Sequence, residues 1–199
     1  MNNPIRKKLD ENLEILKEVL GIGESFDIIL RIFEIGDKKA ALLFIDGFIK
    51  DDLILPILKL METERGELSV DTIKKICNKR LPYYEMNTVQ DLDKAVQEIL
   101  AGPQLLLIDG VDEGIIIDGR TWLSRSPEEP ELEKATRGPA DGFVETMLFN
   151  VNAVRRRIRD VNFRAEVLQV GKRSKNDVAL VYMKDIINPD LLQDIKSKL

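Results

Sequence analysis

Histidine is absent from this chain of 199 residues, and cysteine occurs once, as Cys77. The chain therefore lacks imidazole catalysis, zinc clusters of the usual kinds and any disulfide framework. No apolar run approaches the ~18 residues that a membrane-spanning helix needs. Acidic residues outnumber basic ones by 35 to 30, and the net charge of −5 argues against a chain that mainly binds nucleic acid. These absences favour a soluble, non-enzymatic protein without a cofactor or metal.

Familiar catalytic motifs are missing as well. The sequence contains no GxxxxGK[ST] loop, no GxSxG elbow and no GxGxxG after a predicted strand. Three Asp-Gly corners, which begin at Asp46, Asp109 and Asp118, each end an apolar run and fit tight turns; a hard-cation site is the alternative. Cys77 lies in a lysine-rich segment, where helix packing is favoured over a reactive thiol.

Helices alternate with pairs of strands along the chain. Apolar residues on one helical stripe, followed by a glycine and two apolar runs around a turn, make up a helix-hairpin unit. In the first unit Asn3 is the expected helix cap and Gly21 the stop, and in the second Thr88 is the expected cap. The sequence predicts three such units, with helices over 3–20, 88–101 and 142–159 and strands over 26–35, 40–45, 104–109, 114–118, 163–170 and 177–183.

This order predicts an α+β fold of two small subdomains with mixed sheets and a linker between them. Two further helices, over 52–62 and 69–79, are expected between the first and second units. The turn-rich segment 79–84 favours a boundary there. We therefore expect one subdomain over residues 1–85 and another over 86–199. The helix that starts at Asn188-Pro189 still has its pattern at the last residue, so we expect the chain to be part of a longer protein.

Basic residues gather near the third unit, against the mean charge of the chain. The run 155–159 contains four arginines, and Arg164, Lys172, Arg173 and Lys175 follow it. An anionic membrane surface, an acidic partner or the chain's own acidic segment 128–133 would complement them, and a solvated helix surface is the plain alternative. The acidic segment belongs to an irregular stretch, 124–141, of a length that is uncommon in a compact domain unless it is functional or disordered.

Residues in and after that stretch resemble the amino-terminal soluble domain of the A subunit of GerA-type spore germinant receptors. The similar motifs are a Glu-Pro pair, an Arg-Gly-Pro triplet, a Gly-Phe-x-Glu pattern and an arginine-rich helix. Ala140 departs from the family, in which a basic residue often follows Arg-Gly-Pro. The residues that carry the resemblance are Glu129, Pro130, Glu133, Arg137, Gly138, Pro139, Gly142, Phe143, Glu145, Asn150, Arg155, Arg156 and Arg157.

The resemblance implies a membrane receptor of which this chain is the cytoplasmic head, on the core side of the inner spore membrane. It implies B and C subunits as partners, other A subunits as a second kind of partner, and a membrane portion that follows this chain. The expected role is signal transduction and receptor assembly during nutrient-triggered germination. We expect Arg137 and Glu145 to hold the irregular stretch on the helix start, and Asn150, Arg156 and Arg157 to face a neighbouring subunit, lipid or the membrane portion. The alternative is a module that binds a germinant or ion in a cleft between the subdomains.

Overall fold

The structure is a computed structural model and describes residues 3–49, 85–120 and 142–199. Its helices are α1 (Leu9–Leu20), α4 (Leu92–Ala101), α5 (Met147–Arg157) and α6 (Pro189–Lys198). Its strands are β1 (Ile28–Ile35), β2 (Lys38–Ile45), β3 (Glu85–Val89), β4 (Gln104–Ile108), β5 (Gly114–Asp118), β6 (Phe163–Val170) and β7 (Asn176–Met183). The predicted α+β class is confirmed.

Several sequence predictions lie outside the described residues. They are the helices over 52–62 and 69–79 with Cys77, the boundary segment 79–84, and the stretch 124–141 with Glu129, Pro130, Glu133, Arg137, Gly138 and Pro139.

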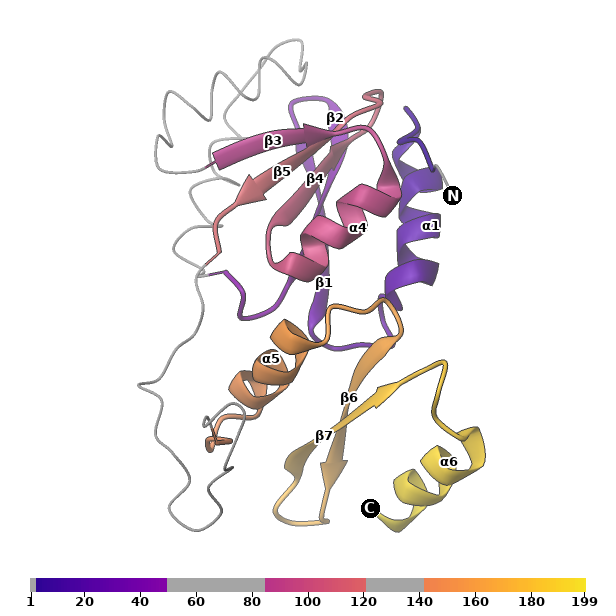
Figure 1. Ribbon diagram of the computed structural model, residues 1–199, viewed down its shortest axis with the longest axis vertical. Helices are drawn as coiled ribbons and strands as arrows, with labels where there is room; N and C mark the ends of the chain where they lie inside the picture. The colour runs from indigo at the N-terminus through magenta and orange to yellow at the C-terminus, as the bar shows by residue number, and fades with distance from the viewer. Residues whose placement is uncertain (1–2, 50–84, 121–141) are drawn as a thin grey trace.

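All three predicted helix-hairpin units are present, as α1–β1–β2, α4–β4–β5 and α5–β6–β7. The first two share a five-stranded sheet with the order β1-β2-β4-β5-β3, and the third forms the two-stranded sheet β6-β7. Neighbouring strands in both sheets run antiparallel. We call residues 3–49 and 85–120 the sheet unit and residues 142–199 the C-terminal unit; they occupy opposite ends of the molecule in Figure 1.

The first and third units also share a side-chain detail that supports the repeat. In α1, Asn12 Oδ1 accepts a hydrogen bond from Arg6 N over 2.9 Å, and Asn12 Nδ2 donates to Arg6 O over 2.6 Å. In α5, Asn150 makes the same pair of bonds with Val144 N and O, at 2.7 and 2.6 Å. Each asparagine sits at the fourth position of its helix and fastens the peptide six residues earlier.

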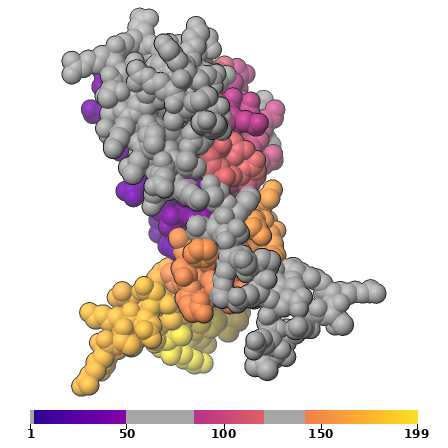
Figure 2. Space-filling model, turned by 90° about the vertical axis from the view of Figure 1, so that its left-hand side faces the viewer, coloured from indigo at the N-terminus to yellow at the C-terminus, as the bar shows by residue number. Residues whose placement is uncertain are grey.

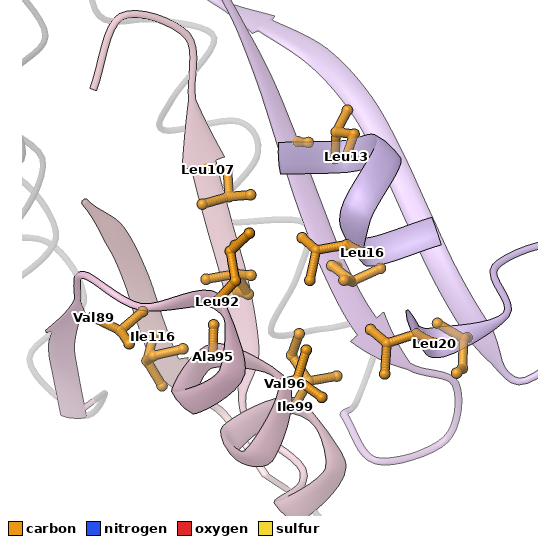
Figure 3. Close-up of a cluster of buried hydrophobic side chains, with 14 of the residues drawn as sticks. Leu13, Leu16, Leu20, Val89, Leu92, Ala95, Val96, Ile99, Leu107 and Ile116 are labelled. Atoms are coloured by element: carbon orange, nitrogen blue, oxygen red, sulfur yellow. The ribbon is translucent and has the colours of Figure 1, made fainter. Parts of the chain in front are cut away.

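Both helices of the sheet unit cover one face of the five-stranded sheet (Figure 1). In Figure 3, Leu16 and Leu20 of α1 point toward Val96 and Ile99 of α4, and Leu13 lies further along α1. Leu16, Leu20 and Ile99 are completely buried. The i, i+3, i+4 spacing of these residues sets one apolar stripe on each helix, and burial of those stripes on the sheet supplies most of the stabilisation of such helices.

Each of the three helices begins later than the sequence predicted. Residues before α1 run extended beside the start of α4, where Asn3 O accepts from Leu92 N over 2.8 Å and Ile5 N donates to Gln90 O over 2.9 Å. Asn3 is therefore not the cap of α1, which starts at Leu9, because tertiary pairing of residues 3–5 overrides the local preference. Asp91, not Thr88, caps α4 by accepting from Lys94 N over 3.1 Å. The third helix starts at Met147 instead of Gly142.

Thr88 lies in β3, a strand that the sequence did not predict. Its residues are exposed except for the half-buried Met86 and the buried Val89, so the strand lacks the apolar alternation that marks a strand in the sequence. Strands from both sides of the expected 85/86 boundary are neighbours in one sheet, since β2 pairs with β4 through Leu42↔Leu106. The described sheet unit thus does not follow that division.

The C-terminal unit places α5 against one side of the β6–β7 ribbon, and α6 follows β7 in Figure 1. As predicted, Asn188 caps α6, its Oδ1 accepting from Asp190 N over 2.9 Å, and Pro189 is the first helical residue. Figure 2 shows this unit at one end of the long axis. Among the described residues, no helix has the length and apolarity to cross a membrane.

Candidate functional site

The two units meet at a buried ion pair between α5 and the start of β1. Arg155 Nε donates to Asp27 Oδ2 over 2.8 Å, and Arg155 Nη2 donates to Asp27 Oδ1 over 3.0 Å. Both side chains are fully buried. A buried pair recovers its desolvation cost only when the remaining hydrogen-bonding positions are also filled, and the surrounding residues fill them.

Ser25 is the hub of these additional bonds. Its Oγ donates to Asp27 Oδ1 over 2.8 Å and accepts from Arg155 Nη2 over 3.1 Å and from Ala165 N over 2.9 Å. Phe26 N also donates to Ala165 O over 2.9 Å. The segment before β1 is therefore held on the outer edge of β6 by backbone and side-chain bonds together.

An aromatic ring completes the surroundings of the arginine. The guanidinium carbon of Arg155 lies 4.0 Å from the centroid of the Phe163 ring, within the range of a cation–π contact. Phe163 is 1% exposed and packs with Val151 of α5 and Ala165 of β6. We call Ser25, Asp27, Arg155 and Phe163 the junction.

A second, partly exposed charge cluster lies beside the junction. Glu24 accepts from Arg164 Nε over 2.9 Å and from Lys184 Nζ over 2.9 Å. The hydrogen bonds from Lys184 and Arg164 hold the pKa of the Glu24 carboxyl below its usual value. Arg164 also donates to Val161 O over 2.6 Å, which fixes its guanidinium close to the end of α1.

Gly21, the predicted stop of α1, has a positive φ of 65°. A Cβ at this position would lie 2.3 Å from Arg164 Nε, closer than any contact allows. Glycine is thus required twice here, by the left-handed backbone and by the approach of the arginine.

The predicted basic surface needs a correction. Arg155 is 0% exposed and Arg164 is 2% exposed, so neither belongs to that surface. Arg156 and Arg157 are exposed at the end of α5, and Arg157 Nη1 donates to Ala153 O over 2.8 Å. The run therefore divides by helical position: one arginine enters the junction and the next two face outward.

The other described motif residues precede or open the same helix. Gly142, Phe143 and Glu145 are exposed, with Phe143 at 75%. Asn150 is half-buried and uses its side chain for the Val144 clasp, so it serves the fold of its own segment instead of the expected polar face. Only Arg155 of these residues enters the junction.

The Asp-Gly corners have structural roles that the structure makes visible. Asp109 Oδ1 accepts from Leu9 N over 2.9 Å and so supports the first turn of α1. Asp118 accepts from Arg120 Nε over 2.8 Å, and the hydrogen bond from Arg120 lowers the pKa of that carboxyl. Asp46 N donates to Asp27 O over 2.7 Å, which ties this corner to the junction backbone.

Sequence reasoning missed Ser25 and Asp27, the two partners that give Arg155 its role. Both lie in a short polar stretch that reads as an ordinary loop before a strand. The predicted helix-hairpin units offered one signal, since they put the strand pairs over 26–45 and 163–183 in equivalent positions, but they did not indicate that these two segments touch.

The fold and the junction define a class: an α+β domain of repeated helix-hairpin units whose two parts are joined by buried charges. The family model described as Bacillus/Clostridium GerA spore germination protein matches residues 14–199. The chain belongs to this family.

Curated relatives agree with that assignment. The chain is 33% identical to Stage V sporulation protein AF of Bacillus subtilis over 190 residues, which is 95% of this chain and 38% of that protein. It is 30% identical to Spore germination protein KA of Bacillus subtilis, covering 98% of this chain and 36% of the relative, and 29% identical to Spore germination protein GerLA of Bacillus cereus, covering 96% and 40%. The chain thus spans about two fifths of the length of these relatives.

A solved structure has the same fold. The N-terminal domain of the A subunit of the Bacillus megaterium spore germinant receptor GerK3 superposes with a TM-score of 0.76 at 22% identity. The match covers 100% of this chain and 73% of that one.

Proposed function

We propose that this chain is the N-terminal, non-enzymatic domain of a spore germinant receptor A subunit and that it acts in receptor assembly and signal transduction. The observation that carries the proposal is the different exposure of three consecutive arginines in α5. Arg155 is fixed in the junction, while Arg156 and Arg157, the next two residues, are exposed. A partner that binds these two exposed arginines contacts α5 directly beside Arg155, the residue that bonds to Asp27.

The junction connects a movement of α5 on binding to the sheet unit. A displacement of α5 moves Arg155, and Arg155 holds Asp27 at the start of β1 by two hydrogen bonds. Because protein interiors are close-packed, a displaced helix and the residues packed around it move together as a rigid body. The proposed signal is therefore a shift of the C-terminal unit against the sheet unit.

The proposed partners are the B and C subunits of the same receptor, and other A subunits. Family membership and the names of the relatives support a receptor complex. The proposed location is the inner spore membrane, with this domain on the core side and the membrane portion in the remainder of the longer protein. An arginine pair is suited to acidic groups, because guanidinium forms paired hydrogen bonds with carboxylate or phosphate.

Charge reversal of Arg156 and Arg157 to glutamate in the full-length protein tests the proposal. The isolated domain should stay folded, since both residues are exposed, while the amount of receptor recovered as a complex from spore membranes should fall. Reversal of Lys172 and Arg173, an equal change of charge in the exposed β6–β7 turn, is the matched control. Normal complex recovery and normal germination of the Arg156/Arg157 variant would refute the proposed role of this surface.

A further inference from the structure

The outer edge of β7 is a row of backbone groups that no strand of the described residues pairs with. Lys184 N donates to Asn162 O over 2.8 Å. In the β6–β7 ladder the numbers of two paired residues always add up to 346, as in Phe163↔Met183. Because antiparallel pairs alternate between hydrogen-bonded and non-hydrogen-bonded positions, the even-numbered β7 residues bond to β6. The N–H and C=O groups of Asp177, Ala179 and Val181 consequently point away from β6.

The opposite edge of this ribbon is closed by the sheet unit. There the outward groups of Ala165 are both used, with N donating to Ser25 Oγ and O accepting from Phe26 N. The alternation of hydrogen-bonded pairs predicts that the N–H and C=O of Ala165 point away from β7. The two bonds to Ser25 and Phe26 agree with this prediction. Within β7, Met183 O accepts from Ile186 N and Ile187 N. Among the described residues no backbone hydrogen bond comparable to these reaches the outward groups of Asp177, Ala179 and Val181.

Side chains along β7 protect this edge only near its start, at Asp177. The strand then has six uncharged residues in a row, Val178 to Met183, and it contains no lysine, arginine or proline. The edges of the larger sheet differ: β1 carries Arg31 and Glu34, and β3 is five residues long and begins with Glu85. Natural proteins guard edge strands with charges, proline or short length, so an eight-residue edge with a single charge, at Asp177, is open to a partner strand.

We propose that β7 pairs antiparallel with β7 of a second copy of this chain, about a two-fold axis at Leu180. Two-fold pairing within one sheet requires paired residue numbers with an even sum, and the axis at Leu180 gives a sum of 360. Ala179 then faces Val181 of the second copy, and Val181 faces its Ala179. Both pairs use outward groups and exchange two hydrogen bonds each. The result is a four-stranded sheet, which is more stable than a two-stranded ribbon.

Charges select this register over its neighbours. With the axis at Leu180, residues 178–182 of the uncharged run face the same residues of the second copy, and Met183 faces its Asp177. Lys175 then lies opposite Asp185 of the second copy just beyond the strand ends. With the axis at Val181, Asp177 faces Asp185, a like-charge pair that is destabilising. With the axis at Ala179, Asp177 faces Val181, and only residues 178–180 of the uncharged run face themselves. A second copy is thus complementary to this edge in both length and charge.

This surface rests on the assembly role proposed above, but its test needs only the purified 199-residue chain. Dimerisation can fail while the Arg156 and Arg157 experiment succeeds, and the reverse outcome is equally distinguishable. Sedimentation equilibrium over a concentration series should show a monomer–dimer equilibrium. A chain that remains monomeric up to roughly millimolar concentration, a weak-binding limit, overturns the proposal.

Cysteine cross-linking tests the register in a background with Cys77→Ser. Leu180→Cys places two thiols at the axis, in a non-hydrogen-bonded pair with Cα atoms about 4.5 Å apart, which a disulfide spans. Val178→Cys is the matched control, because its two copies lie about 13 Å apart, four residues along the strand. Rapid dimer formation by Leu180→Cys alone supports the register; equal cross-linking of both variants, or of neither, overturns it.

Proline substitution tests the edge. Ala179→Pro removes an outward N–H without taking a bond from the β6–β7 ladder, so circular dichroism should be unchanged while the dimer Kd rises about tenfold or more, a change of ~1.4 kcal/mol. Gln169→Pro removes an outward N–H on the other edge of the ribbon and should leave Kd unchanged. Equal effects of the two substitutions on Kd overturn the assignment to β7. If Ala179→Pro unfolds the chain, the cysteine pair decides the question.

Discussion

The guanidinium of Arg155 and the carboxylate of Asp27 meet inside the protein although 128 residues separate them in the sequence, with Nε 2.8 Å from Oδ2. Helix α5 contributes the arginine and the turn before β1 contributes the aspartate. The C-terminal unit is therefore fastened to the sheet unit by two charges that neither unit can keep buried alone.

Removal of one partner of this pair should strongly destabilise the protein. Arg155→Met keeps much of the side-chain volume but leaves Asp27 charged and buried, and we expect a loss of about 3–5 kcal/mol in the free energy of unfolding. Arg156→Met, an exposed neighbour, should change it by less than about 0.5 kcal/mol. Urea unfolding followed by circular dichroism measures both.

The double variant Asp27→Leu with Arg155→Met separates pair loss from charge burial. It removes both charges together, so it should be more stable than Arg155→Met alone. A double variant that loses as much as the sum of the two single ones contradicts this account, because the pair would then contribute nothing as a pair.

Local patterns predicted much of the fold and little of the junction. The hairpin around Gly110 and the cap at Asn188 were predicted correctly, because turn residues and apolar runs act over a few positions. The helix starts were misplaced where Asn3 and Thr88 pair with distant backbone. The arginine run could not be divided into buried and exposed members, since that depends on Asp27, a contact made only in the folded chain.

Substitution of Gly21 should lower the stability of the protein for two reasons, the left-handed backbone at the end of α1 and the nearby Arg164 side chain. Gly21→Ala forces an L residue into the left-handed region, which costs about 1–2 kcal/mol, and its Cβ would meet Arg164 Nε at 2.3 Å. We expect a larger loss than for Gly23→Ala, also at positive φ but with no atom within 4 Å of the added Cβ. Thermal unfolding of the two variants gives the comparison. Equal losses would show that Arg164 yields without cost.

Asn152 is a buried side chain whose Oδ1 and Nδ2 have no hydrogen-bond partner among residues 3–49, 85–120 and 142–199. A polar group that is buried without partners costs about 1–3 kcal/mol. Asn152→Leu, similar in size, should therefore leave stability unchanged or raise it by about 1 kcal/mol. The equivalent change at Asn12, whose amide makes two bonds to Arg6, should be destabilising. A strong loss at Asn152 would indicate that its amide has a partner in solution.

The attachment of α6 should depend on pH. Lys196 of α6 contacts Glu166 of β6 at 2.5 Å, and the Tyr182 hydroxyl also donates to Glu166. Burial alone would raise the pKa of Glu166, but the hydrogen bonds from Lys196 and Tyr182 outweigh it, so the pKa lies below the usual 4.5. Burial, and then the bond to Glu166, raises the pKa of Tyr182 from 10.0 to about 12.

The directions of these two pKa shifts define a pH range over which the attachment of α6 should be constant. A lowered carboxyl pKa means that the contribution of Glu166 is complete above about pH 4.5 and is lost as the pH falls through the folded value. A raised tyrosine pKa means that the contribution of Tyr182 is complete below about pH 10 and is lost as the pH rises through 12. Amide exchange of α6, corrected for intrinsic rates, should show constant protection between those limits and accelerate on the acid side. Glu166→Gln should flatten the acid limb and Tyr182→Phe the alkaline one, because each removes the group that titrates. An acid limb that persists in Glu166→Gln would assign the effect to another carboxylate, such as Glu24, whose charge also acts on the pKa of Glu166.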